Sequence, residues 1–230
     1  MGLRPETAWQ PPRELTGAVQ AATLPGQWAG WTGPPMLGSQ GSQDELRLRE
    51  YDLLARIAKG EQAAMRALFA AHQLRVHRFV LRLVRREDVA EDVVTEVFLD
   101  VWRQAARFEG RASVSTWLLS IARFKAYSAL RRRSEAPLDD EFAETIEDQD
   151  DTPEVTLQKS DKAGVLRACI DRLSREHREV IDLVYYQEQS IEDVSRIVGI
   201  PENTVKTRMF HARKRLSELC REAGLDRGWP

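Results

Sequence analysis

Cysteine and histidine are scarce in this chain. Its 230 residues include only two cysteines and four histidines. Cys169 and Cys220 are far apart in the sequence without CxxC spacing, and the histidines form no cluster with the spacing of a metal site or a catalytic triad. These absences argue against a zinc site, a disulfide framework and a catalytic centre. We therefore predict no enzyme, no metal and no cofactor, and the shortage of cysteine fits a reducing cytoplasm.

Long apolar runs are also missing. No stretch approaches the roughly 18 consecutive apolar residues that mark a membrane-spanning helix, and the N-terminus lacks the basic-then-apolar pattern of a signal peptide. We expect no membrane insertion and a cytoplasmic location. The hydrophobic fraction of 42% is ordinary for a soluble protein. The net charge is only −2, so a nucleic-acid-binding role would require the charges to be segregated along the chain.

The first part of the chain, residues 1–43, differs from the rest. It holds six of the ten prolines and seven of the thirteen glycines, with few periodic apolar residues. We expect this N-terminal extension to be disordered. Its tryptophans, Trp9, Trp28 and Trp31, leave open a partner-binding segment, and Met36 leaves open a start further downstream.

Apolar residues at helical spacing dominate the remainder. They predict four helices between residues 44 and 133, and almost no alternating strand pattern is present. Residues 134–154 contain ten acidic and no basic residues, which is typical of a flexible, extended linker. Residues 155–222 form a second helical stretch. The sequence therefore predicts an all-α fold of two small helical domains, 44–133 and 155–222, joined by an acidic linker.

The second domain has the pattern of a helix-turn-helix. Ser190 is placed to cap a first helix. Gly199 suits the left-handed residue that ends a helix, and Pro201 suits the first turn of the next one. The second helix keeps its apolar residues on one side and has no acidic residue between positions 203 and 217, although it carries several cations. Such a helix can enter the major groove of DNA.

Three blocks in this order resemble the bacterial RNA polymerase sigma factors of the extracytoplasmic function (ECF) group of the sigma-70 superfamily. They are Asp88–Trp102, Phe108–Arg133 and Gly199–Leu216, and the likeness extends over about residues 48–220. The resemblance implies that the first domain corresponds to the family's σ2 domain and the second to its σ4 domain.

The first block implies a contact with core RNA polymerase. In the family, this helix binds a coiled coil of the β′ subunit, an interface that suits apolar anchors with a charged rim. The candidate residues are Glu91, Asp92, Glu96 and Phe98. For Phe98 and Trp102, a place in the hydrophobic core is the alternative.

The second block implies melting and binding of the −10 promoter element. A melted base needs an aromatic or apolar wall with backbone donors, and nearby cations can contact phosphates. Many family members have Asn in place of Phe124 and Asp in place of Ser128, so the family's base preference is not carried over. The candidate −10 residues are Phe108, Gly110, Ser113, Ser115, Arg123, Lys125, Arg131 and Arg132.

The third block implies reading of the −35 element. Residues near the start of a recognition helix reach base edges, while other cations contact phosphates. The candidates for bases are Lys206, Thr207, Phe210 and His211, and those for the DNA backbone are Thr204, Arg208, Arg213 and Lys214. His211 stands where relatives often carry Arg, so the contact at that base is expected to differ.

The implied function is transcription initiation. The protein would bind core RNA polymerase through its β′ and β subunits and direct it to promoter DNA, with an anti-sigma factor as a further partner. The acidic linker is either a soluble tether or a segment that threads the basic channels of the polymerase. One alternative is a helix-turn-helix regulator that binds DNA without polymerase, although it would need neither of the first two blocks. A second is an adaptor that binds the polymerase or an anti-sigma partner without promoter activity.

Overall fold

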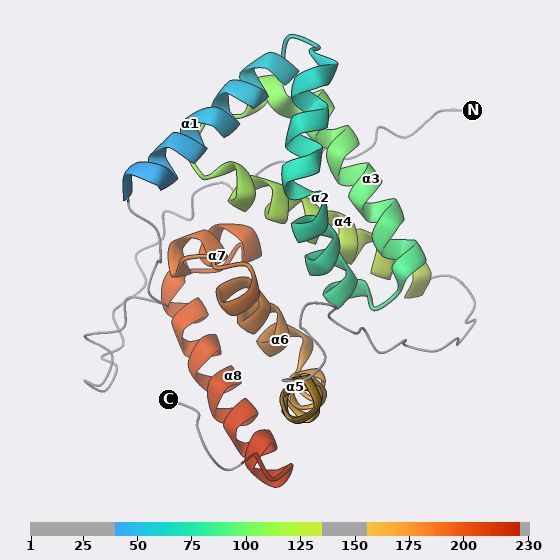
Figure 1. Cartoon of the computed structure of the whole chain (residues 1–230), viewed down its shortest axis with the longest axis vertical. Helices are drawn as coiled ribbons and strands as arrows, with labels where there is room; N and C mark the ends of the chain where they lie inside the picture. Colours follow the sequence, from blue (N-terminus) through green and yellow to red (C-terminus); the bar gives the residue numbers. More distant parts are fainter. Residues whose placement is uncertain (1–39, 135–155, 226–230) are drawn as a thin grey trace.

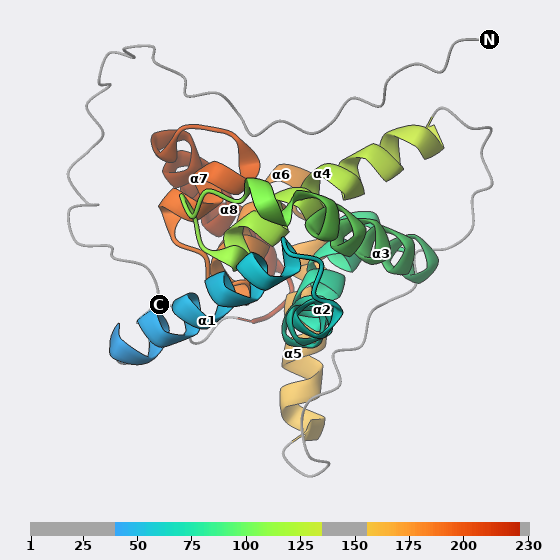
Figure 2. The same cartoon turned by 90° about the horizontal axis from the view of Figure 1, so that it is seen from above.

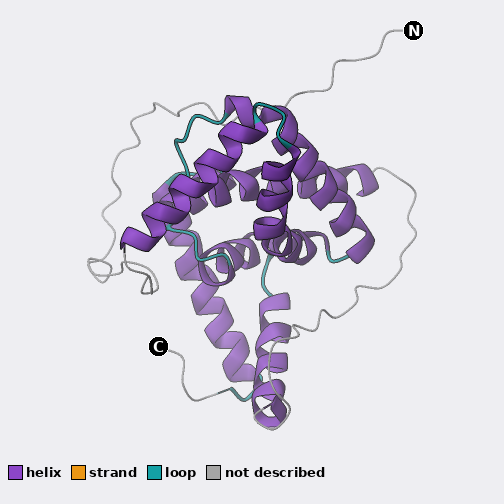
Figure 3. Cartoon of the chain, turned by 45° about the horizontal axis from the view of Figure 1, so that its top comes forward, coloured by secondary structure: helices purple, strands orange, loops and turns teal. Residues whose placement is uncertain are grey.

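The computed structural model describes residues 40–134 and 156–225, and all regular structure in these two ranges is helical (Figures 1 and 3). This confirms the predicted all-α fold. The predicted N-terminal extension lies outside the described residues up to position 39, and the acidic linker lies outside them from position 135. The first helix begins at Gln40, inside the stretch assigned to the extension.

Four helices form an N-terminal unit. They are α1 (Gln40–Ile57), α2 (Gln62–Val84), α3 (Glu87–Gln104) and α4 (Val114–Ser134), with a 3-10 turn, η1 (Ala105–Arg107), after α3. α2, α3 and α4 pack against one another, and α1 lies across α2 and η1. Apolar side chains at helical spacing make the core of this unit, and Leu68, Phe79, Val97 and Leu118 are at most 1% exposed.

The remaining helices form a C-terminal unit. They are α5 (Thr156–Asp171), α6 (Arg175–Ile181), the π-helix η2 (Asp182–Tyr186), α7 (Ile191–Val198) and α8 (Glu202–Glu222). α8 is the central helix, since α5, α6 and α7 all pack on it. The first turns of α5 extend away from the rest of the molecule (Figure 2). Leu183, Leu216 and Leu219 on the inner faces are at most 1% exposed.

The two units pack against each other. The most extensive contact is between α4 of the N-terminal unit and α7 of the C-terminal unit, and Figure 1 shows the N-terminal unit above most of the C-terminal unit. Side chains of α4 and α2 also reach α6 and η2, where Arg123 pairs with Glu179 and Arg82 pairs with Asp182. None of the helices described here is long and apolar enough to cross a membrane.

The two cysteines come together although the sequence separates them. Cys169 on α5 is buried, and Cys220 on α8 is partly buried against the same core. Burial, together with a hydrogen bond to the Cys169 thiol, raises the pKa of Cys220 to about 11. Packing of α5 on α8 creates this contact, which no spacing rule in the sequence reveals.

Candidate nucleic-acid interface

The turn between α7 and α8 contains the helix cap and the left-handed glycine that the sequence predicts. The Ser190 hydroxyl accepts a hydrogen bond from the Asp193 N–H (3.1 Å) and donates one to the Asp193 carboxylate (2.6 Å), so it caps α7. Gly199 ends α7 with φ of 76° in the left-handed region. The Ser195 hydroxyl donates to the Ile200 carbonyl (2.6 Å), which fixes the path of the turn. Together, the Ser190 cap, the left-handed Gly199 and the Ser195 hydrogen bond set the angle between α7 and α8.

α8 has the two faces expected of a recognition helix. Its buried face consists of Val205, Met209, Ala212, Leu216 and Leu219. On the opposite face, the four residues predicted to reach base edges are all exposed: Lys206, Thr207, Phe210 and His211. Helical spacing brings these four into one stripe, as insertion into a groove requires.

The four residues predicted to contact the DNA backbone flank this stripe. Thr204 and Lys214 are exposed, and Arg213 is partly exposed. Arg208 is held within the C-terminal unit, because its guanidinium lies 3.2 Å from the carboxylate of Glu176 on α6. Burial, with electrostatic repulsion from neighbouring basic side chains including Arg208, lowers the pKa of His177.

The loop before α4 is built around an aromatic cluster. The Phe108 ring lies 5.5 Å from that of Tyr51 on α1 and 5.1 Å from that of Trp117 on α4. Phe108 is therefore part of the packing that anchors the loop, with one side partly exposed. Gly110, at the exposed tip, has φ of 71°, a conformation that favours glycine.

The two serines predicted for the −10 element take different positions. The Ser113 hydroxyl accepts the Thr116 N–H (3.0 Å) and so caps α4. Ser115 is partly buried, and its hydroxyl has no hydrogen-bond partner within the described part of the chain. The hydroxyl oxygen itself is buried, so a ligand that approaches the loop would reach it only after a local rearrangement.

The cations predicted for the −10 element have different partners in the structure. Lys125 lies 2.9 Å from Asp100 and 3.3 Å from Glu96 on α3. Burial opposes its charge, but these two carboxylates raise its pKa overall. Arg132 is 3.5 Å from Glu96. Arg123 faces the C-terminal unit instead.

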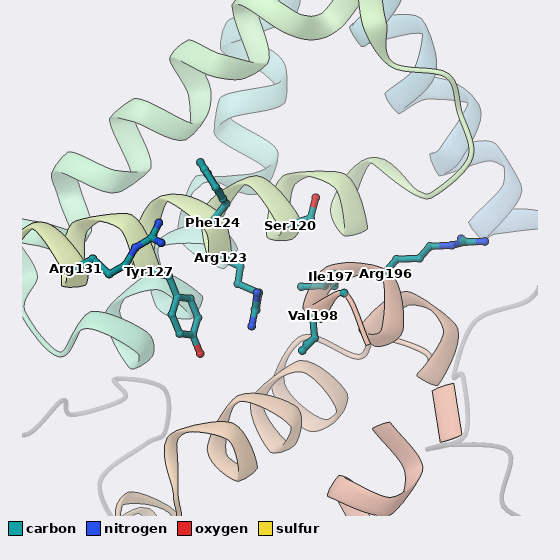
Figure 4. Close-up of a pocket in the computed structure, with 9 residues that line it drawn as sticks. Ser120, Arg123, Phe124, Tyr127, Arg131, Arg196, Ile197 and Val198 are labelled. Atoms are coloured by element: carbon teal, nitrogen blue, oxygen red, sulfur yellow. The ribbon is translucent and has the colours of Figure 1, made fainter. Parts of the chain in front are cut away.

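Arg131, near the end of α4, is exposed. It lines a cavity of about 370 Å³ between α4 and α7, together with Arg123, Phe124, Tyr127 and Arg196. In Figure 4, Arg123 and Tyr127 point from α4 toward the C-terminal unit, whereas Phe124 points the other way.

The outer face of α3 carries the residues predicted to bind the polymerase. Glu91 and Asp92 are exposed, and Glu96 is partly exposed at the edge facing α4. Phe98 lies in the core instead, 4% exposed, with its ring 4.8 Å from that of Phe69. The exposed apolar side chains of this face are Leu99 (49%) and Trp102 (37%).

Sequence reasoning missed Leu99 and the π-helix. Leu99 falls one residue after Phe98 on α3, so it points away from the core when Phe98 points inward. A helical wheel centred on Val93, Val97 and Val101 would have separated them. The π-helix η2 adds one residue to a turn and rotates the residues after it, and no motif in Asp182–Tyr186 predicts that insertion.

Two family models match the chain. Residues 68–136 match Sigma-70 region 2, and residues 163–216 match Sigma-70 region 4. The first range covers most of α2 to α4, and the second contains the helix-turn-helix.

Individual sigma factors are similar over most of the chain. The ECF RNA polymerase sigma factor SigM of Mycobacterium tuberculosis is 33% identical over 168 residues, which cover 73% of this chain and 83% of the relative. The RNA polymerase sigma-H factor of Pseudomonas aeruginosa is 27% identical over 190 residues, which cover 76% of this chain and 97% of the relative.

Solved structures agree with these sequence comparisons. The sigma factor RpoE from Bartonella quintana, in complex with the anti-sigma factor NepR, superposes with a TM-score of 0.57 at 26% identity, covering 70% of this chain and 98% of that one. CnrH in complex with the cytosolic domain of CnrY gives a TM-score of 0.56 at 22% identity, covering 76% and 98%, and shares the fold. This chain belongs to the sigma-70 family of RNA polymerase factors, as a member of its ECF group.

Proposed function

We propose that this ECF sigma factor divides promoter recognition between two separate surfaces. As a transcription initiation factor it directs core RNA polymerase to promoters. In this assignment, α8 reads the −35 element, and the loop before α4 together with α4 holds the −10 element. The observation that carries the assignment is the single exposed stripe of Lys206, Thr207, Phe210 and His211 on α8, opposite its buried face.

Within the stripe, the side chains have distinct chemistry. Lys206 donates hydrogen bonds as guanine acceptors require, and the Phe210 ring suits apolar contact with a thymine methyl group. The Thr207 hydroxyl donates to the Asn203 carbonyl (2.9 Å) in the free chain, so its oxygen remains able to accept from a base. Lys214 and Arg213 beside the stripe would meet phosphates and supply affinity that does not depend on sequence.

The outer face of α3 is the surface we assign to core polymerase. Leu99 and Trp102 offer exposed apolar area, while Glu91 and Asp92 provide a charged rim. Exposed apolar patches rimmed by charge are characteristic of protein interfaces. Because Phe98 is buried, we assign it to supporting this face from within, not to direct contact.

Three further expectations belong to the same proposal. Promoter recognition requires no catalytic group of this chain, so we expect no enzymatic activity. The site of action is the cytoplasm, where the polymerase works. The structurally similar sigma factor RpoE is in complex with the anti-sigma factor NepR, and we propose an anti-sigma partner for this chain as well.

The test is run-off transcription with core bacterial RNA polymerase on a pool of genomic promoter fragments. New start sites should appear when the wild-type chain is added, and they should be lost with Lys206→Ala plus His211→Ala. The matched control is Lys59→Ala, which removes an exposed lysine from the turn after α1. Duplex binding without any polymerase-dependent start site would favour the plain helix-turn-helix regulator, and polymerase binding without transcription would favour the adaptor.

A further inference from the structure

Phe124 is the most exposed aromatic side chain of α4. It is 36% exposed, although phenylalanine is among the residues most often buried. In the described parts of the chain, the Phe124 ring forms neither an aromatic pair nor a cation–π pair, whereas Trp117 and Tyr127 on the same helix each form one. A ring that the protein itself leaves partly uncovered is available to stack on a flat ligand.

This ring lies midway along one face of α4. In Figure 4, Ser120 and Phe124 point to the same side of the helix, away from the C-terminal unit. Trp117 and Arg131 lie seven residues before and after Phe124, which is close to two helical turns, and so share this face. Trp117 packs on Phe108 of the loop before α4, with 5.1 Å between ring centres. The face therefore connects the aromatic loop with the basic end of α4.

The side chains around Phe124 on this face are polar. Ser120 and Ser128 lie one turn on either side of it, and the exposed Arg131 guanidinium is 3.4 Å from the Ser128 hydroxyl. A protein partner would require more apolar area around the ring, since the centre of a protein interface is depleted of charged residues. A ring flanked by hydroxyls and a guanidinium suits a nucleotide, because the base can stack on the ring while the phosphate binds the polar groups.

Stacking on the Phe124 ring requires a base that has left the double helix. In an intact duplex, neighbouring bases cover both faces of each base, whereas a melted base can offer one face to an aromatic side chain. The −10 element is the part of the promoter that is melted in the proposed function. Stacking makes no hydrogen bond to the edge of the base, so such a contact does not depend on the donors and acceptors of that edge.

We propose that Phe124 is a specificity-determining residue of the −10 site, and that its ring stacks on one unpaired base of the melted element. This inference rests on the proposed function of α4 and adds the kind of contact that α4 makes. The other residues proposed for this element supply hydroxyls, cations and the packed ring of Phe108, whereas Phe124 supplies an exposed ring. The contact selects an unpaired base over a paired one, and it tolerates a flat base whose edge groups have been removed.

Two substitutions of Phe124 separate stacking from apolar packing. Phe124→Tyr keeps the flat face of the ring, and Phe124→Leu keeps an apolar side chain but removes the ring. The control is Leu74→Ala, which truncates an exposed apolar side chain (57%) on α2. Circular dichroism verifies that each variant is folded. Phe124→Gln, which is also favourable in a helix, replaces Phe124→Leu if the leucine variant aggregates.

The first measurement compares single-stranded with duplex DNA. The protein is assembled on core polymerase, with core polymerase alone as the background, and the probes are random-sequence pools of about 20 nucleotides. Phe124→Leu should bind the single-stranded pool about fivefold or more weakly than the wild type, which is the lower end of the effect of removing one stacking platform. Phe124→Tyr should retain the affinity because it retains the ring. The affinity for the duplex pool should be the same in all these proteins.

The second measurement locates the stacked base. Single strands carrying the −10 element of a promoter found by run-off transcription are made with an abasic site at each position in turn. At one position, loss of the base should weaken binding of the wild type about fivefold or more and leave binding of Phe124→Leu unchanged. Difluorotoluene at that position, which is flat but lacks strong hydrogen-bonding groups, should restore binding of the wild type.

Three results would overturn the inference: single-stranded binding by Phe124→Leu that equals the wild type, a Phe124→Tyr variant as weak as Phe124→Leu, or equal losses on single-stranded and duplex DNA. Failure of the proposed function is recognised separately, because then neither the wild type nor any variant supports run-off transcription. In that case the comparison of the two random pools still decides whether Phe124 stacks on an unpaired base.

Discussion

Arg123 and Glu179 are 56 residues apart in the sequence, yet the Arg123 Nε donates a hydrogen bond of 2.7 Å to the Glu179 Oε1 across the contact between the two helical units. Through this bond, a cation predicted to bind DNA is held by the C-terminal unit. The packing of the two units therefore decides which groups this cation contacts in the free chain.

The first prediction separates base contacts from phosphate contacts on α8. Phe210→Ala should weaken binding to a promoter found by run-off transcription by about 1–3 kcal/mol. It should also relax the sequence preference at the base pair that Phe210 contacts. Lys214→Ala should weaken binding to all duplexes and reduce the slope of log affinity against log salt by about one. Fluorescence anisotropy at several salt concentrations measures both. Equal effects of the two variants on all sequences would contradict the assignment.

The second prediction concerns the outer face of α3. Leu99→Ser should weaken binding to core polymerase, because it removes apolar area from the centre of the proposed interface. Leu74→Ser is the control, since Leu74 is a similarly exposed leucine (57%) on α2. Pull-down with core polymerase measures the difference. Loss of binding in the control, or none in Leu99→Ser, would place the interface elsewhere.

The third prediction compares two glycines. Gly199→Ala should destabilise the protein by about 1–2 kcal/mol, because its φ of 76° is strained for any residue with a Cβ atom. Gly164→Ala, inside α5, should stabilise it by up to about 1 kcal/mol through helix propensity. A Cβ atom at either position meets no other atom within 4 Å, so clashes do not enter. Urea denaturation gives both values, and a stabilising Gly199→Ala would refute the left-handed turn.

The fourth prediction follows from a buried acid. Burial raises the pKa of Asp182 to about 6, although Arg82 opposes the shift. The unfolded chain titrates near 3.9, so the folded chain takes up this proton first as the pH falls. The group's contribution to the free energy of unfolding therefore increases by up to about 3 kcal/mol as the pH falls through 6 toward 4.

Asp182→Asn isolates this effect because it cannot titrate. The variant should be more stable than the wild type at pH 7.5, and its advantage should shrink as the pH is lowered to 5. Glu179 also faces Asp182 and adds to the upward shift, while Gln187 and Arg82 favour the charged form. Thermal unfolding of both proteins across this pH range measures the difference. A difference that stays constant with pH would show that Asp182 titrates normally.

The fifth prediction concerns Cys220. With a pKa of about 11, its thiolate fraction at pH 8 is about two orders of magnitude below that of an ordinary cysteine of pKa about 8.5. Alkylation by iodoacetamide should be slower by that factor in the folded chain than in urea. Cys169→Ala removes the hydrogen bond from the neighbouring thiol and should accelerate the reaction. Alkylation of the folded wild type at the rate seen in urea would contradict the buried thiol pair.

The fold was predictable from local chemistry. Helical spacing of apolar residues predicted four helices between residues 44 and 133, and the structure has four there, from Gln40 to Ser134. Ser190, Gly199 and Pro201 identified the turn because caps and turns depend on neighbours in sequence. The stripe on α8 followed from the same periodicity. These features need no knowledge of the elements that pack on them.

The contact between the units was not predictable in this way. Arg123 and Lys125 look equivalent in the sequence, yet Lys125 pairs with α3 and Arg123 with α6. Their partners are set by the tertiary packing, which brings Glu96 and Asp100 of α3 to Lys125 and Glu179 of α6 to Arg123. Phe98 and Leu99 differ for a related reason, since one residue of helical rotation decides which of the two is buried.

The most direct test of this account is run-off transcription with core bacterial RNA polymerase on a pool of genomic promoter fragments. The account predicts new start sites with the wild-type chain and with Lys59→Ala, and loss of these start sites with Lys206→Ala plus His211→Ala. Start sites that persist in the double variant would show that the exposed stripe of α8 does not read the promoter, and would contradict the account.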